Sequence, residues 1–127
     1  SLATVDLAKV DLYTGKLSLC KAGAALSLLC QNGEIKRFAA SSLPIGILQN
    51  TSFDEQLCTL GEGDVLLMLS DGAIACGEGF LCEMLRKYAR KPAKEIAYAI
   101  CSEVKSRLDD NHADDITVAA IKLVKGI

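Results

Sequence analysis

Short apolar and polar segments alternate through the first 70 residues of the chain. Residues 3–12 alternate in polarity, and further strand-length segments cover 17–22, 26–30, 34–38 and 53–60. Turn sequences such as Thr14-Gly15 and Asn32-Gly33 separate them, and such turns recur about every ten residues. This spacing predicts antiparallel strands arranged as a β-sandwich.

One apolar run in this region does not alternate. Val65–Leu69 is five consecutive hydrophobic residues, and it is followed by Ser70, Asp71 and Gly72. An unbroken run of strand length indicates a strand that is buried on both faces. We therefore expect a central strand whose C-terminal end presents the carboxylate of Asp71.

The hydrophobic period becomes helical after the central strand. Two stripes recur at helical spacing between residues 79 and 108, and Pro92 falls at the first turn of the second. A last strand is predicted over residues 115–124. The predicted fold class is α+β: an antiparallel β-sandwich with strands in 1–70, two helices over about 79–108 and the final strand. We see no linker or repeat, and treat residues 1–127 as one domain.

Acidic residues lie at the ends of two predicted strands. Asp71 follows the central strand, whereas Asp114 and Asp115 precede the last one. If these strands run antiparallel at the same sheet end, their carboxylates can meet, and a cation would relieve their repulsion. Oxygen ligands suit Mg²⁺, Mn²⁺ or Ca²⁺, and such ions favour hydrolysis of phosphate esters. An ordinary turn and an ordinary solvated loop explain the same spacing, and that alternative stays open.

Composition limits the classes of function. The chain has 127 residues, half of them hydrophobic, and its net charge of -2 offers no case for nucleic acid or for an anionic membrane surface. No apolar stretch reaches the roughly 20 residues that span a bilayer. The six cysteines show no C-x-x-C spacing and His112 is the sole histidine, so we expect mostly buried free thiols in a reducing compartment rather than zinc or disulfides.

Five short motifs, taken in order, resemble those of the bacterial PPM-type (type 2C) serine/threonine phosphatases, in the branch of stage II sporulation protein E. They are the first strand with Tyr13-Thr14-Gly15, Lys21-Ala22-Gly23 with the Asn32-Gly33 turn, residues 43–47 around Pro44, residues 63–72 ending in Ser70-Asp71-Gly72, and residues 114–118.

The resemblance implies a β-sandwich flanked by helices, with a binuclear Mn²⁺ or Mg²⁺ site. Asp71 and Asp114 would be metal ligands. Asp115 and Thr117 would orient the loop or its waters, and Gly72 would let the backbone pass close to the metals. The implied reaction is hydrolysis of phosphoserine or phosphothreonine. In the sporulation branch the implied partner is a phosphorylated anti-sigma-factor antagonist, within the control of sporulation sigma factors.

One motif of the family is missing from these 127 residues. Its N-terminal Asp-Gly, in which the Asp bridges the two metals, has no counterpart before Asp71, because neither Asp6 nor Asp11 is followed by glycine. Since Ser1 also runs straight into a predicted strand, we expect the C-terminal half of a phosphatase domain. We expect that this polypeptide alone is inactive and that its uncovered edges and apolar faces favour self-association.

The resemblance also implies a cytoplasmic location, in a parent protein that is membrane-anchored as the sporulation relatives are. Two alternatives to the enzyme remain. One is a non-catalytic protein-interaction domain whose acids only form loops. The other is a pseudophosphatase that has lost the N-terminal motif.

Overall fold

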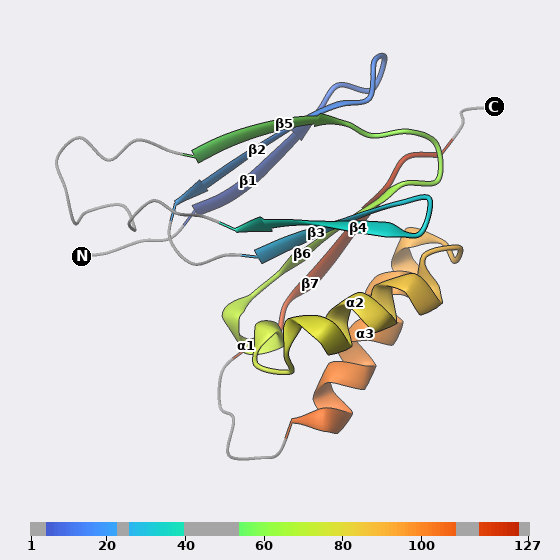
Figure 1. Ribbon diagram of the computed structural model, residues 1–127. Coiled ribbons are helices and arrows are strands. Elements are labelled where there is room, and N and C mark those ends of the chain that lie inside the picture. Colours follow the sequence, from blue (N-terminus) through green and yellow to red (C-terminus); the bar gives the residue numbers. More distant parts are fainter. Residues whose placement is uncertain (1–4, 23–25, 40–53, 109–114, 125–127) are drawn as a thin grey trace, which may run out of the picture.

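Two antiparallel sheets and a layer of helices make up the part of the chain that the structure describes (Figure 1). The structure is a computed structural model, and it describes residues 5–22, 26–39, 54–108 and 115–124. The strands are β1 (Val5–Val10), β2 (Lys16–Ala22), β3 (Leu26–Gln31), β4 (Glu34–Ala39), β5 (Asp54–Thr59), β6 (Val65–Leu69) and β7 (Val118–Lys122). The helices are α1 (Asp71–Ile74), α2 (Glu78–Tyr88) and α3 (Ala93–Arg107).

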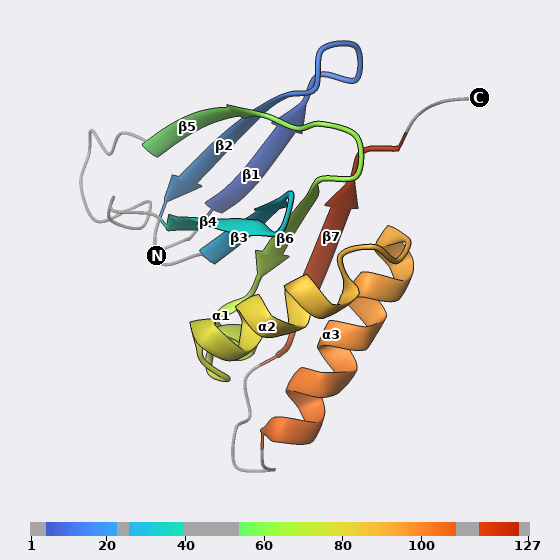
Figure 2. The same cartoon turned by 45° about the vertical axis from the view of Figure 1, so that its right-hand side comes forward.

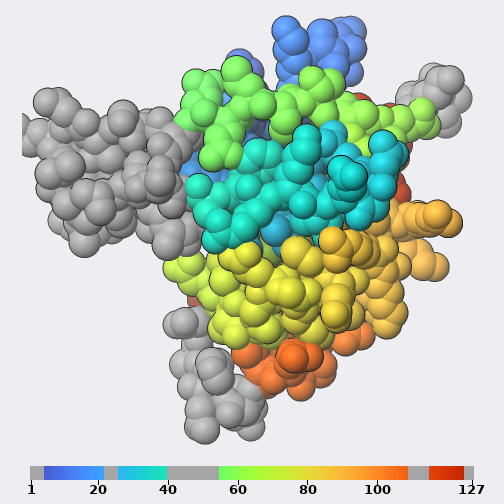
Figure 3. Space-filling view, in the orientation of Figure 1, coloured from blue at the N-terminus to red at the C-terminus, as the bar shows by residue number. Residues whose placement is uncertain are grey.

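The elements stack in three layers. A three-stranded sheet, ordered β1-β2-β5, faces a four-stranded sheet ordered β4-β3-β6-β7, and α2 and α3 lie on the other side of the four-stranded sheet (Figure 2). In Figure 3, β5, β4 and α2 form successive bands down the molecule. The predicted α+β sandwich is confirmed. The described helices cover one side only, and the outer face of the three-stranded sheet leaves Leu7 and Leu57 exposed.

The strand β6 separates the two apolar cores. Val65, Leu67 and Leu69 belong to the core under the helices, whereas Leu66 belongs to the core between the sheets, against which Met68 also packs. Adjacent side chains of a strand point to opposite faces. An uninterrupted apolar run is therefore what this position requires, and the prediction of a strand buried on both faces is confirmed.

The strands β6 and β7 are antiparallel neighbours, with Leu69 paired to Val118. The end of β6 therefore lies beside the start of β7, which is the arrangement that a meeting of their carboxylates requires. The last strand is shorter than the predicted 115–124, because residues 115–117 and 123–124 lie outside the ladder. The sequence also gave no sign of the single helical turn α1, because four residues are too few to show a helical period. The motif at residues 43–47 lies outside the described residues.

A buried lysine links the two sheets near this same end. Lys21, at the end of β2, is only 1% exposed, and its Nζ lies 2.6 Å from Oδ1 of Asp6 in β1. The same Nζ donates to Oγ of Ser27 in β3 over 2.7 Å. A buried charge is tolerated when it is paired and hydrogen-bonded. These contacts therefore join β1, β2 and β3 across the interior of the sandwich.

Replacing one leucine of β6 tests how far the fold depends on this strand. We expect Leu67→Ala, at a side chain with 0% exposure, to lower the free energy of unfolding by about 3 kcal/mol, because it removes buried methyl groups and leaves a cavity. Urea denaturation followed by circular dichroism measures the loss. Leu57→Ala makes the same change at a side chain that is 75% exposed, and should cost less than about 0.5 kcal/mol. Equal losses for the two variants would contradict the account of β6.

Candidate metal centre

Ser70 joins the end of β6 to the segment that leads into β7. Its backbone N–H donates to the carbonyl oxygen of Thr117 over 3.0 Å. Its Oγ accepts a hydrogen bond from the backbone N–H of Thr117 at 2.8 Å and donates to the carbonyl oxygen of Asp115 at 3.2 Å. Three hydrogen bonds from one residue thus fix the backbone of residues 115–117 beside Asp71. We call these bonds the Ser70 clamp.

Ser70 also starts the helical turn that carries Asp71. Its carbonyl oxygen accepts hydrogen bonds from the N–H groups of Ala73 and Ile74, at 3.0 and 3.1 Å. Gly72 and Ala73 are buried, and Ala73 joins the core under the helices. Asp71, the first residue of α1, is left exposed at the edge of the sheet. A serine at this N-cap position would ordinarily bond its own helix through its side chain, but here the hydroxyl is used by the clamp.

The structure brings together most of the predicted site residues. Asp71, Asp115 and Thr117 are all exposed, and the Ser70 clamp holds their backbones at one end of the four-stranded sheet. Asp115 and Thr117 contribute to the clamp through backbone groups rather than through their side chains. Asp114 lies outside the described residues. The residue that sequence reasoning missed is Ser70. The sequence carries no signal for this role, because the partners of the Ser70 hydroxyl are backbone groups 45 and 47 residues away.

The carboxylates of Asp71 and Asp115 have no ion-pair partner within the described part of the chain. Exposed carboxylate oxygens are the donors that Mg²⁺ and Mn²⁺ prefer, so the chemistry of these donors fits such a cation. Their number is small: across the residues that the structure describes, no three His, Cys, Asp or Glu side chains are grouped to hold a metal. The described residues thus offer two exposed carboxylates near one end of the sheet, fewer than a metal site needs.

The cysteines play no part in this arrangement. All six are free, but only Cys30 is buried, so the prediction that most of them are buried is wrong. The other five lie at intermediate exposure, and three of them, Cys58, Cys76 and Cys82, pack against a core without being fully covered. Desolvation raises the pKa of the Cys58, Cys76 and Cys82 thiols. A thiol with a raised pKa stays protonated near neutral pH and is a poor metal ligand.

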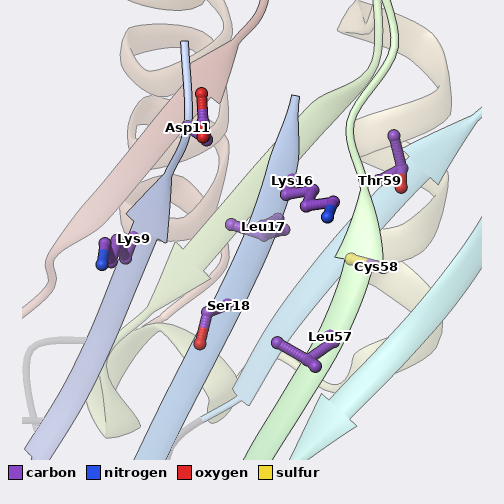
Figure 4. Close-up of a pocket in the computed structure, with 8 residues that line it drawn as sticks. All are labelled: Lys9, Asp11, Lys16, Leu17, Ser18, Leu57, Cys58 and Thr59. Atoms are coloured by element: carbon purple, nitrogen blue, oxygen red, sulfur yellow. The ribbon is translucent and has the colours of Figure 1, made fainter. Parts of the chain in front are cut away.

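A hollow of about 470 Å³ opens on the three-stranded sheet, away from the carboxylates (Figure 4). It is lined by residues such as Lys9, Lys16 and Leu57. Lys16 begins β2, whereas Lys21 near the end of that strand bonds to Ser27, beside the end of β6. The hollow therefore lies at the far end of the strands from Asp71, and it is not part of the candidate metal centre.

Removing one hydroxyl tests the Ser70 clamp. We expect Ser70→Ala to lower the free energy of unfolding by about 1–2 kcal/mol, because the N–H of Thr117 and the carbonyl of Asp115 lose their partner. Amide hydrogen exchange should also become faster at Thr117. Ser102→Ala, at an exposed position of α3, is the matched control and should change stability by less than about 0.5 kcal/mol. Unchanged exchange at Thr117 in Ser70→Ala would show that the clamp does not hold this segment.

The comparisons with known proteins all point to the same family. The sequence model for stage II sporulation protein E matches residues 1–124. Stage II sporulation protein E of Priestia megaterium is 30% identical over 127 residues, which covers 95% of this chain and 22% of that protein. The protein of the same name from Bacillus subtilis (strain 168) is 25% identical, over 95% of this chain and 15% of its own length.

A solved structure shows the same fold. The phosphatase domain of the cell fate determinant SpoIIE from Bacillus subtilis superposes with a TM-score of 0.79 at 26% identity, covering 98% of this chain and 57% of that one. The chain thus spans less than a quarter of the curated relatives that it matches and just over half of the solved domain. The chain belongs to the stage II sporulation protein E family, and its fold is that of the PP2C phosphatase domain of this family.

Proposed function

We propose that this chain supplies one side of the catalytic centre of a metal-dependent protein serine/threonine phosphatase. The observation that carries the proposal is the Ser70 clamp, which holds Asp71 beside residues 115–117 at one sheet end in a chain of this family. In this proposal Asp71 and Asp114 are metal ligands. Asp115, Thr117 and Gly72 are supporting residues that shape the two loops.

The proposed metals are Mn²⁺ or Mg²⁺, forming a two-metal centre in the intact enzyme. One crystal form of the Bacillus subtilis phosphatase domain was presoaked with manganese, which supports this choice. When bound, such ions lower the pKa of a coordinated water and neutralise phosphoryl oxygens. The chain's own residues provide fixed positions for that chemistry. The buried Gly72 and Ala73 anchor the turn, so the exposed carboxylate of Asp71 stays at the sheet end with little freedom to move away.

The same carboxylates explain why the polypeptide by itself should be a poor enzyme. Asp71 is the sole aspartate in these 127 residues that is followed by glycine, so in this proposal the bridging Asp-Gly motif of the family is supplied by sequence outside these residues. Each missing carboxylate removes negative charge that holds the cations, and metal affinity falls with it. Residues 1–127 are, in this proposal, the C-terminal part of a single phosphatase domain.

The proposed substrate is a phosphoserine on an anti-sigma-factor antagonist protein, in the control of sporulation sigma factors. The relatives named stage II sporulation protein E support this choice of pathway. The proposed location is a cytoplasmic domain of a membrane-anchored parent. Within the described residues, no helix has the length and apolar character needed to cross a bilayer.

The proposal includes self-association of the isolated polypeptide. Leu7 and Leu57 are 57% and 75% exposed on the outer face of the three-stranded sheet. They flank Cys20 and Ser18 of β2, to which they are paired. Exposed apolar side chains on a sheet face and unpaired strand edges both favour association.

A phosphatase assay tests the proposed role of Asp71. In the full-length protein, with a phosphoserine peptide and millimolar Mn²⁺, we expect Asp71→Asn to lower kcat/KM by about 100-fold or more, because a metal ligand is lost. Glu83→Gln removes an exposed carboxylate from α2 and should leave activity unchanged. The 127-residue polypeptide alone should show little turnover under the same conditions.

The outcomes separate the enzyme from its alternatives. Wild-type activity in Asp71→Asn would contradict the assignment of this ligand. An inactive full-length protein whose melting temperature does not respond to Mn²⁺ would favour a pseudophosphatase or an interaction domain. Robust turnover by the 127-residue polypeptide, abolished by Asp71→Asn, would overturn the proposal that one side of the centre is insufficient.

A further inference from the structure

A dense group of cations lies where α2 ends and α3 begins. Arg86, Lys87, Arg90, Lys91 and Lys94 fall within nine residues that contain no acid, and all five are exposed. We call these five residues the basic corner. The chain has a net charge of -2 and 14 lysines and arginines in total, so more than a third of its positive charge is concentrated in one short segment.

The basic corner is not neutralised by the rest of the described chain. The two ion pairs found among the described residues are Lys21–Asp6 and Arg37–Glu78, and neither involves the basic corner. Positive charges gathered on one surface attract anionic ligands. The corner is therefore a candidate for recognition of an anionic ligand.

Two members of the basic corner line a cleft of about 580 Å³. Arg86 and Arg90 form part of its lining, together with Lys122 of β7 and the Asn32-Gly33 turn. Arg86 donates through Nε to the carbonyl oxygen of Gly33 at 3.3 Å, which leaves its terminal N–H groups for a ligand. The side chain of Arg90 makes no hydrogen bond or ion pair to any residue that the structure describes.

Lys122 neutralises carbonyl groups that would otherwise repel an anion from the cleft. Its Nζ donates to the carbonyl oxygens of Ala89 and Lys91, both at 2.9 Å. The C-terminal end of a helix carries partial negative charge on its free carbonyls, and this charge would repel an anion. The ammonium of Lys122 offsets that charge just past the end of α2. The two arginines are then the dominant charges available to a ligand on this side of the cleft.

Two carboxylates also line the cleft, Glu62 and Asp64. Oδ2 of Asp64 is occupied, because it accepts from Nε2 of Gln31 at 2.9 Å and from the N–H of Gly61 at 2.7 Å. The lining is therefore mixed, with cations from α2 and β7 and acids from the turn before β6. A uniformly anionic bilayer would meet Glu62 and Asp64 along with the arginines. A polypeptide segment can place single carboxylates against the arginines alone.

We infer that this cleft and the basic corner bind an acidic polypeptide segment of a partner protein. Carboxylates of the segment would pair with Arg86 and Arg90, whose planar guanidinium groups suit bidentate contacts. The segment would then continue along the exposed Lys87, Lys91 and Lys94. Beyond the cleft, these lysines extend the positive surface, and an extended ligand with several acids matches it better than a compact anion.

This docking surface is separate from the candidate metal centre. Asp64 precedes β6 and Asp71 follows it, and five residues of strand span roughly 17 Å. In Figures 1 and 2, the connection between α2 and α3 lies at the end of the molecule away from α1. The inference therefore does not depend on the proposed phosphatase activity, and a binding assay without catalysis can test it.

Fluorescence anisotropy with a labelled peptide tests the docking surface. The probe is a twelve-residue peptide in which Asp and Glu alternate with Gly and Ser, and the reference peptide carries Asn and Gln in place of the acids. We expect the wild-type chain to bind the acidic peptide at low salt and not the reference peptide. Arg86→Glu with Arg90→Glu should weaken binding roughly tenfold or more, since two exposed charge pairs are reversed.

The control is an equal change of charge elsewhere. Lys9→Glu with Lys105→Glu reverses two exposed lysines on β1 and α3, and should leave peptide affinity within a factor of two. Arg90→Glu alone serves if the double variant fails to fold, because the side chain of Arg90 has no partner to lose among the residues that the structure describes. Equal weakening by both pairs, or binding to anionic vesicles of phosphatidylserine without binding to the peptide, would overturn the inference. Binding to a single-stranded oligonucleotide in preference to the peptide would do the same.

Discussion

The structure depends on the burial of one short strand on both of its faces. The run Val65–Leu69 can be buried on both faces without burying a polar side chain, so β6 lies between the helical layer and the three-stranded sheet. Burying five side chains of this kind contributes on the order of 10 kcal/mol before opposing entropy is counted. The burial of β6 on both faces determines its register with β7 and the position at which the chain leaves the sheet. Asp71 lies at that exit because the apolar run ends there.

Polar contacts hold together segments that the apolar cores bring close to one another. Ser70 holds the 115–117 segment through backbone groups, and Lys21 joins three strands of both sheets near the same end. The Ser70 contacts link segments 45 or more residues apart, and the Lys21 contacts link neighbouring strands of the chain. The end of the sandwich that carries the carboxylates is therefore held by polar contacts as well as by the apolar cores, as a site requiring fixed ligands needs.

The sequence predicted the parts of the fold that follow from local pattern. The Asn32-Gly33 turn has positive φ at both residues, 51° and 81°, as the Asn-Gly pair indicated. The antiparallel pairing of β6 and β7 was a condition for their acids to meet, and the structure has this pairing. The Ser70 clamp was not predicted, because its partners are backbone groups of a remote segment that leave no mark on residue identity. The burial of Lys21 likewise follows from how two sheets pack, and the short turn α1 has no period to detect.

The central claim is that the clamped ends of β6 and β7 form one side of a metal centre. Paramagnetic broadening by Mn²⁺ tests it most directly, because a weak half-site is enough to produce the effect. The account predicts that trace Mn²⁺ broadens the amide resonances of residues 70–72 and 115–117 first, and that Asp71→Asn removes this preference. Broadening centred instead on Glu62 and Asp64, or unchanged by Asp71→Asn, would contradict the claim.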